Sequence, residues 1–185
     1  MKKKAVIFPG VGYTKDKPLL YYAGKIAKEC GYELSYIEFS GIEWSRDKLR
    51  DPDFLKQMEE VCLKKTEDAI VRADIGPEDE LVFISKSIGT VAATAYAKRN
   101  ALKPKQICFS PLVLIEPFVE DEGAVLFYGD SDPLADHLEI ERIAKEKELE
   151  AHRIAGGNHS LETGDTAADL ENMKSIMDRV SKILK

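Results

Sequence analysis

The chain has 185 residues, 44% of them hydrophobic and 32% charged, and a formal net charge of −6 at pH 7. This length suits one domain over residues 1–185, with a core large enough to fold without disulfide bonds. The acidic balance excludes a typical nucleic-acid-binding protein, which needs a basic face to neutralise phosphates. No apolar stretch approaches the ~20 residues that span a bilayer, so we expect no membrane partner. The apolar run after the lysines at positions 2–4 is too short for a signal peptide.

Strand-like runs alternate with amphipathic helical stretches along the whole chain. Several of the strand-like runs are apolar almost without interruption, which is typical of strands covered by helices on both faces. The pattern predicts an α/β fold with three layers, in which helices cover both faces of an open, mostly parallel sheet of about six strands. Strands are predicted over residues 5–8, 33–39, 81–85, 106–110, 124–128 and 152–155, and helices over 19–31, 54–73, 88–99, 138–150 and 166–184.

Two of the predicted helices carry clear local signals. The first ends at Gly31, a residue suited to a helix C-cap. The last has apolar residues at spacings of three and four, so this stripe should dock on the sheet. Its members are Leu170, Met173, Ile176, Met177, Val180, Ile183 and Leu184.

The three cysteines are widely spaced and form no C-x-x-C pair. Cys30, Cys62 and Cys108 therefore favour reduced core residues over a disulfide or a zinc site. We expect a cytoplasmic protein without a metal.

Ligands bind beyond the carboxyl ends of the strands in open α/β sheets, and Ser87 lies there, on the turn that follows the third predicted strand. A serine on a sharp strand-to-helix turn is pushed out of the sheet into reach of a substrate. The usual motif is G-x-S-x-G, whereas residues 85–89 read S-x-S-x-G, with Ser85 at the first glycine position. The N–H of Ile88, at the helix start, would point toward a developing oxyanion. An ordinary turn with Ser87 as the helix N-cap is the alternative interpretation.

An acid and a histidine follow the fifth and sixth predicted strands. Asp132 can orient a histidine and stabilise its charged form, although Asp130 is an alternative and the segment also reads as a plain turn. His159 follows two glycines, which allow the backbone to swing it back over the sheet edge. Histidine has the pKa that a general base needs, and His137 and His152 fit this role less well.

Serine, acid and histidine thus fall at three strand ends in the order Ser…Asp…His, which predicts a catalytic triad. The chain resembles the α/β-hydrolase superfamily over nearly its whole length. The residues that carry the resemblance are 9–12, 85–89, 129–132 and 157–159.

The resemblance implies further roles and exposes some departures. Val11 would supply the second oxyanion N–H, with Pro9 at the position where the family often has histidine. We expect no antiparallel strands before the first predicted strand, although such strands are usual in the family. The span 111–123 is too short for a lid domain, and Glu116 within it is a second-choice triad acid.

These observations predict a serine hydrolase that cleaves a small ester or thioester without a cofactor. Tyr13, Leu112 and Leu134 are candidates for the acyl pocket of this enzyme. Two other functions stay open: a Rossmann-like nucleotide-binding module that uses the G-x-G at residues 10–12, and a hydrolase-like binding protein without activity. The oligomeric state and the physiological substrate cannot be read from the sequence.

Overall fold

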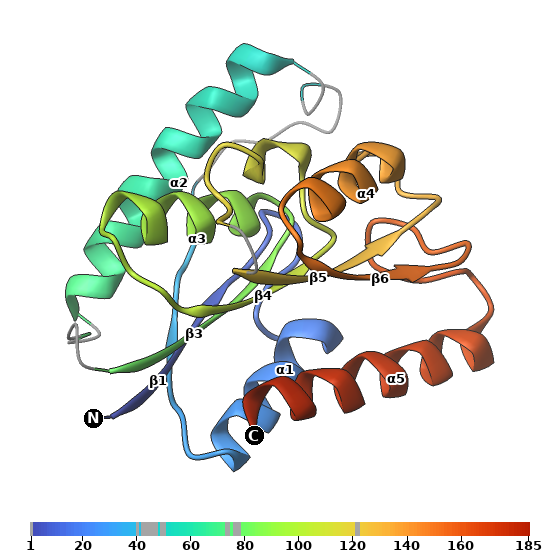
Figure 1. The fold of residues 1–185 in the computed structure, drawn as a ribbon, viewed down its shortest axis with the longest axis horizontal. Helices are drawn as coiled ribbons and strands as arrows, with labels where there is room; N and C mark the ends of the chain where they lie inside the picture. Colours follow the sequence, from blue (N-terminus) through green and yellow to red (C-terminus); the bar gives the residue numbers. More distant parts are fainter. Residues whose placement is uncertain are drawn as a thin grey trace.

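The computed structural model describes residues 2–39, 41, 48, 51–72, 75, 79–120 and 123–185. In this part of the chain six strands form one sheet, in the order β2-β1-β3-β4-β5-β6 (Figure 1). All five neighbouring pairs are parallel, which confirms the predicted open α/β architecture. The strands are β1 (Lys3–Phe8), β2 (Glu33–Tyr36), β3 (Glu80–Lys86), β4 (Lys105–Phe109), β5 (Ala124–Gly129) and β6 (Glu150–Ile154).

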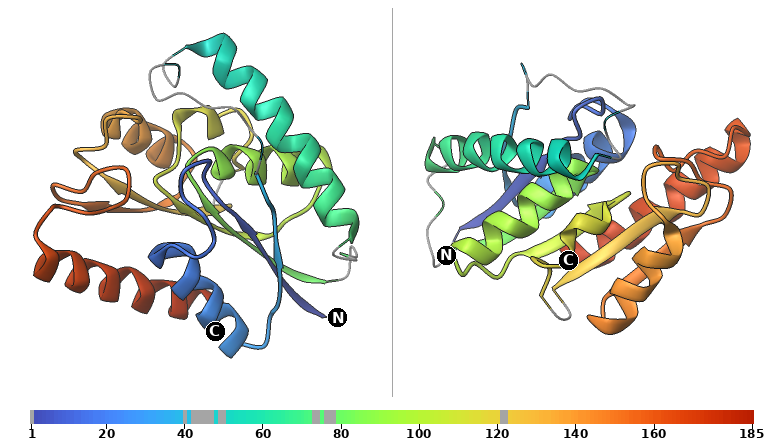
Figure 2. Two further views of the ribbon diagram at one scale, coloured as in Figure 1. Left: turned by 180° about the vertical axis from the view of Figure 1, so that it is seen from behind. Right: turned by 90° about the horizontal axis from the view of Figure 1, so that it is seen from above.

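Helices cover both faces of this sheet and complete the three layers (Figures 1 and 2). On one face α1 (Pro18–Glu29) packs beside α5 (Thr166–Leu184). On the other face lie α2 (Pro52–Arg72), α3 (Ile88–Arg99), α4 (His137–Glu146) and the short 3₁₀ turn η2 (Val113–Ile115).

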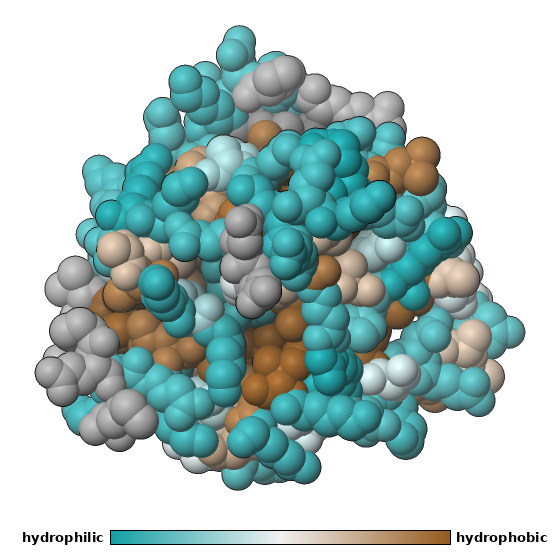
Figure 3. Space-filling view, viewed as in Figure 1, coloured by the Kyte–Doolittle hydropathy of each residue, from teal (hydrophilic) through white to brown (hydrophobic). Residues whose placement is uncertain are grey.

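The alternation of side chains along the strands builds two separate cores. In β1, Val6 and Phe8 belong to the core under α2, α3 and α4, whereas Ala5 and Ile7 belong to the core under α1 and α5. Both faces of each central strand are therefore buried, which explains why these strands read as continuous apolar runs. On the face of the molecule drawn in Figure 3, hydrophilic residues cover most of the surface, and hydrophobic ones are visible in gaps between them.

Some predicted element ends agree with the structure and others are wrong. Gly31 has φ +87° just after α1, and the N–H groups of Gly31 and Tyr32 donate to Lys28 and Ala27, so the predicted C-cap is confirmed. Helix α4 ends at Glu146 and not at residue 150, because Glu148 adopts the left-handed conformation (φ +52°) before β6 begins. Ala73, the predicted end of the second helix, lies outside the described residues.

The apolar stripe of α5 docks only in part. Ile176, Val180 and Leu184 are buried against the sheet and α1, whereas Leu170 is 67% exposed near the beginning of the helix. Strand β2 likewise ends at Tyr36, three residues before the predicted end. Ile37 still donates its N–H to the Ile7 carbonyl, so the chain continues beside β1 after the strand ends.

The neighbouring strands β1 and β3 define the point where the chain changes direction across the sheet. Helix α1 follows β1 on one face and α3 follows β3 on the other, and such a switch point is where ligands bind in open α/β sheets. The approach is close: a Cβ on Gly89 would lie 2.4 Å from the Pro9 carbonyl oxygen and 2.6 Å from that of Phe8. Only glycine fits at this position without a backbone shift.

None of the described helices combines the length and the apolar composition that crossing a membrane requires.

We expect Gly89→Ala to lower the free energy of unfolding by roughly 1–3 kcal/mol, since the added methyl group forces α3 away from β1. Gly31→Ala is the control, because a Cβ there meets nothing within 4 Å and costs only the strain of its positive φ. Urea unfolding followed by circular dichroism measures both variants. A Gly89→Ala protein as stable as the wild type would contradict the close approach.

Candidate active site

Ser87 occupies a strained turn between β3 and α3. Its φ is +56°, a conformation that residues other than glycine rarely adopt. The turn is held at both sides, because the Ser87 N–H donates to the Phe109 carbonyl at 3.1 Å and Thr90 donates to the Ser87 carbonyl through its N–H (2.9 Å) and its hydroxyl (2.6 Å). The Ser87 hydroxyl makes no capping bond to α3. Ser87 thus occupies the N-cap position of α3, as the alternative interpretation expected, but its side chain does not cap the helix.

Ser85 is tolerated at the position where the usual motif has glycine. It is the sixth residue of β3 and is fully buried. Its hydroxyl donates to the Ile107 carbonyl at 3.2 Å and contacts the Cys108 sulfur at 3.5 Å. The side chain thus finds a hydrogen-bond acceptor in the neighbouring strand, so its burial leaves no unpaired hydroxyl.

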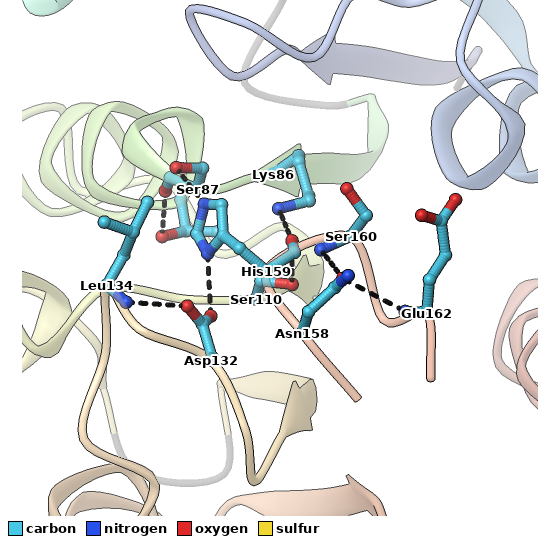
Figure 4. Close-up of polar contacts among 10 residues, drawn as sticks. Lys86, Ser87, Ser110, Asp132, Leu134, Asn158, His159, Ser160 and Glu162 are labelled. Atoms are coloured by element: carbon cyan, nitrogen blue, oxygen red, sulfur yellow. Dashed lines mark hydrogen bonds and ion pairs between the residues drawn. The ribbon is translucent and has the colours of Figure 1, made fainter. Parts of the chain in front are cut away.

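His159 lies between Ser87 and Asp132 in one chain of hydrogen bonds (Figure 4). Its Nε2 is 2.8 Å from the Ser87 Oγ, and its Nδ1 is 2.7 Å from the Asp132 Oδ2. An ionised carboxylate can only accept, so Nδ1 carries the proton and Nε2 is the acceptor for the Ser87 hydroxyl. This arrangement is the one that a serine nucleophile and a general base require.

The carboxylate of Asp132 is held on both of its oxygens. Oδ2 faces His159, and Oδ1 accepts the N–H of Leu134 at 2.8 Å, an Asx-type turn that fixes the side chain on its own loop. Only 2% of the Asp132 side chain is exposed, compared with 22% of His159. The acid is thus shielded from water, while the imidazole still reaches the cavity.

The two alternative acids lie elsewhere. Asp130 accepts from Arg153 at 2.9 Å and from the Gly156 N–H at 2.7 Å, and these donors lower the pKa of its carboxyl group. Glu116 pairs with Arg142 on α4 through both oxygens, at 2.9 and 3.0 Å, and this pairing lowers its pKa. Both carboxylates brace loops against neighbouring elements.

The histidine loop is built from turns that follow β6. Asn158 organises it, because its side-chain oxygen accepts the N–H groups of Ser160 (2.7 Å) and Glu162 (3.2 Å). The loop also packs closely on the end of β5, where a Cβ on Gly129 would lie 2.0 Å from the Gly157 carbonyl oxygen. The loops that bear the acid and the histidine are therefore in direct contact.

Val11 and Ile88 lie beside the serine, on the loop after β1 and at the first residue of α3. Within the described chain neither backbone N–H has a protein acceptor. For Ile88 this is expected, because the first N–H groups of a helix have no partner inside the helix. Both residues line the same cavity as Ser87, so two N–H donors are available at this site.

A cavity of about 320 Å³ opens beside the hydrogen-bonded chain. Its volume is near the lower limit of ligand sites in proteins. Tyr13, Leu112 and Leu134, which the sequence suggested for an acyl pocket, all line it. The other lining residues are Gly10, Val11, Gly12, Met58, Ser87, Ile88, Pro133, Asn158, His159 and Ser160.

Two residues that were not predicted from the sequence lie directly behind the histidine. Lys86 donates from Nζ to the His159 carbonyl at 2.6 Å, and the Ser110 hydroxyl donates to the same oxygen at 3.0 Å (Figure 4). The sequence carries a signal for each residue: Lys86 ends the apolar run of β3, and Ser110 comes directly after β4. Burial lowers the pKa of Lys86 to about 7, and the negative charge of Asp132 opposes this shift.

Similar solved structures share this arrangement of strands and helices. A serine hydrolase without a lid from Xanthomonas campestris superposes with a TM-score of 0.68 at 15% sequence identity, over 97% of this chain and 81% of that chain. Est1E from Butyrivibrio proteoclasticus with bound ferulic acid superposes with a TM-score of 0.69 at 14% identity, over 97% and 87%. This protein has the α/β-hydrolase fold.

A third structure with this fold, an α/β serine hydrolase homologue from Coxiella burnetii, has a TM-score of 0.66 at 12% identity and matches 96% of this chain and 84% of its own. No family profile and no curated protein sequence matches the chain. The predicted resemblance to the α/β-hydrolase superfamily is confirmed for the fold.

The structure also describes the residues that a nucleotide-binding loop or a metal site would use. Helix α1 begins only at Pro18, so Gly10 and Gly12 lie in the cavity wall beside Ser87 and do not open a helix. Among the described residues no group of three His, Cys, Asp or Glu side chains is arranged as a metal site. Cys62 and Cys108 are buried thiols, and Cys30 is a partly exposed one.

We expect Lys86→Met to raise the melting temperature, and to raise it more at pH 6 than at pH 9. The pKa of Lys86 is about 7 in the folded protein and 10.5 ordinarily, so between these values the unfolded chain binds a proton that the folded chain does not. The penalty of burying this lysine is thus complete below pH 7 and is relieved as the pH rises. Calorimetry at several pH values measures the difference, and a gain that does not change with pH would contradict the shifted pKa.

Proposed function

We propose that this protein is a serine hydrolase that cleaves small carboxylic esters or thioesters through an acyl-enzyme intermediate. The observation that carries the proposal is the hydrogen-bonded chain from Ser87 through His159 to Asp132 at the edge of a cavity. The α/β-hydrolase fold supports it, since the compared proteins with this fold include serine hydrolases.

In the proposed first step the Ser87 oxygen attacks the substrate carbonyl carbon while its proton passes to His159 Nε2. Asp132 holds the imidazole through Nδ1 and stabilises the positive charge that develops on the ring. The carbonyl oxygen becomes an oxyanion and accepts the N–H groups of Val11 and Ile88. The N-terminus of α3 adds a favourable dipole at the second of these.

The tetrahedral intermediate then breaks down. His159 returns the proton to the leaving alcohol or thiol, and the acyl group stays bound to the Ser87 oxygen. A water molecule next attacks the acyl carbon while His159 takes its proton, and collapse of the second intermediate releases a carboxylic acid and restores the serine. The residues named here are sufficient for the cycle.

The cavity favours a small uncharged acyl group. Its wall is largely apolar, through Met58, Leu112 and Leu134 among others, and none of the described residues that line it is a lysine or arginine. A carboxylate or phosphate on the acyl chain would find no cationic partner there. We further propose a cytoplasmic location, on the ground that the three cysteines are free thiols.

We expect Ser87→Ala to lower kcat for short p-nitrophenyl esters by at least about 10⁴-fold, because the nucleophile is lost. A fluorophosphonate probe should label the wild type at Ser87, as peptide mass spectrometry can locate. Ser175→Ala, an exposed serine on α5, is the matched control and should keep full activity and full labelling.

The same variants should also be assayed with acyl thioesters, since the proposed mechanism cleaves both esters and thioesters. A folded protein that is not labelled at Ser87 and turns over neither class would refute the proposed function. Saturable binding of a dinucleotide by that protein would favour the nucleotide-binding alternative.

We expect Asp132→Asn to lower kcat by roughly 10³–10⁴-fold with little change in KM, since an amide no longer favours the Nδ1–H tautomer of His159. Glu116→Gln is the control, because Glu116 pairs with Arg142 and does not contact the histidine. The kcat of this variant should stay within about twofold of the wild type. Equal losses in the two variants would exclude Asp132 as the triad acid.

A further inference from the structure

A buried lysine lies directly beneath the proposed catalytic residues. Lys86 is the last residue of β3 and precedes Ser87. By the alternation of the strand its side chain lies on the same face as Val82 and Ile84, which belong to the core under α1 and α5. The side chain is fully buried, although no described residue of that core carries a partner carboxylate for it.

The contacts of Lys86 connect three segments of the site. Its own backbone leads into Ser87, and its Nζ donates to the His159 carbonyl at 2.6 Å. The same Nζ lies 5.2 Å from the centre of the Tyr13 ring, on the loop that bears Val11. Tyr13 is itself held, because its hydroxyl accepts the Leu19 N–H at 3.1 Å.

Buried lysines are uncommon, and the second one in this chain shows the usual compensation. Lys4, which is 3% exposed on β1, forms an ion pair with Glu33 at 3.3 Å. Among the described residues no carboxylate forms such a pair with Lys86, which instead contacts a carbonyl oxygen and an aromatic ring. A cation in this position is costly for folding, so its contacts point to a purpose other than stability.

We propose that Lys86 is a positioning residue for the reaction proposed above: it anchors the backbone of His159 so that the imidazole stays in line between Ser87 and Asp132. This inference rests on the proposed function. Ser110 supports the same carbonyl oxygen from the end of β4, at 3.0 Å. The histidine loop after β6 is thus tied to the ends of β3 and β4 through a single backbone atom.

The anchor matters because the histidine comes from a loop of turns, where Leu161 has φ +61° and two glycines precede His159. A displacement of about 1 Å in a reacting group can cost about 100-fold in rate. Lys86 is protonated only at neutral and acidic pH, because its pKa is about 7, and in that form its positive charge opposes a second positive charge on the His159 ring. Among the described residues, the ionisable groups next to this pair include Asp132, on the loop after β5, and Tyr13. The negative charge of Glu162 acts in turn on Tyr13.

The test compares Lys86→Met with Lys4→Met. Methionine fills most of the volume of lysine without a donor or a charge, and we expect kcat for a p-nitrophenyl ester to fall about 10–100-fold with KM within about threefold. The acid limb of the kcat/KM profile, which reports the free His159, should move to higher pH because a nearby positive charge has been removed. Lys4→Met removes a buried lysine near the amino end of the neighbouring strand β1, away from the carboxyl ends that carry the site, so its kcat and pH profile should match the wild type.

Two further variants separate positioning from general packing. Lys86→Gln keeps an N–H donor, and we expect it to retain more activity than Lys86→Met. Ser110→Ala removes the other donor to the same oxygen, so its effect and that of Lys86→Met should be non-additive in the double variant. Additive losses, or equal activity in the Met and Gln variants, would contradict an action through the His159 carbonyl.

A folded Lys86→Met protein with wild-type kcat and pH profile would overturn the proposal. If that variant does not fold, Lys86→Gln takes its place, and wild-type kinetics in it would overturn the proposal equally. NMR titration of the imidazole signals adds a readout without substrate, because the sequence has three histidines and only that of His159 should shift upward in pKa. Full activity in Ser87→Ala would refute the proposed function, whereas the NMR shift tests the role of Lys86 independently of it.

Discussion

The close approach of α3 to the end of β1 is the constraint on which the rest of this structure depends. It requires glycine at position 89, where the carbonyl groups of Phe8 and Pro9 leave no room for a side chain. With the helix so near, the turn from β3 must be sharp, and Ser87 takes up the strain in a left-handed conformation. The half-buried serine thereby reaches the cavity beyond the strand ends, and the beginning of α3 stands beside the loop after β1. This steric condition thus places the serine hydroxyl beside one cavity, together with the N–H groups of Val11 and Ile88, which have no acceptor among the described residues.

The remaining part of the site depends on contacts between loops. The loop after β5 packs on the loop after β6 at Gly129 and Gly157, and Asp130 ties them further through Arg153 and the Gly156 N–H. Lys86 and Ser110 then hold the histidine loop from below. Hydrogen bonds to a buried cation are strong only because water is excluded, and the same exclusion makes the cation costly. The site therefore combines a strained serine and a buried charge, two features that oppose folding stability.

Much of the fold and part of the site could be predicted because they depend on local patterns. Continuous apolar runs marked the strands, and Gly31 marked the end of α1 through the left-handed conformation that glycine adopts easily. The predictions failed where the pattern is locally ambiguous. The Glu- and Lys-rich stretch after α4 has high helix propensity throughout, yet the chain turns at Glu148 to reach β6. Leu170 continues the apolar spacing of α5, but it stays exposed.

The sequence by itself determined the alternation of strands and helices, because this follows from side-chain periodicity. It also determined the order in which serine, acid and histidine reach one end of a parallel sheet, because all strands of such a sheet run in the same direction. Only the tertiary structure decided which acid faces His159. The three candidate acids all carry a carboxylate, so the sequence does not distinguish them. Asp130 pairs with Arg153, Asp132 with His159 and Glu116 with Arg142, and each partner comes from an element distant in the chain. The tertiary structure also decided what Lys86 contacts. A lysine at the end of a strand is ordinarily solvated, and it is buried here because the loops after β1 and β6 close over it.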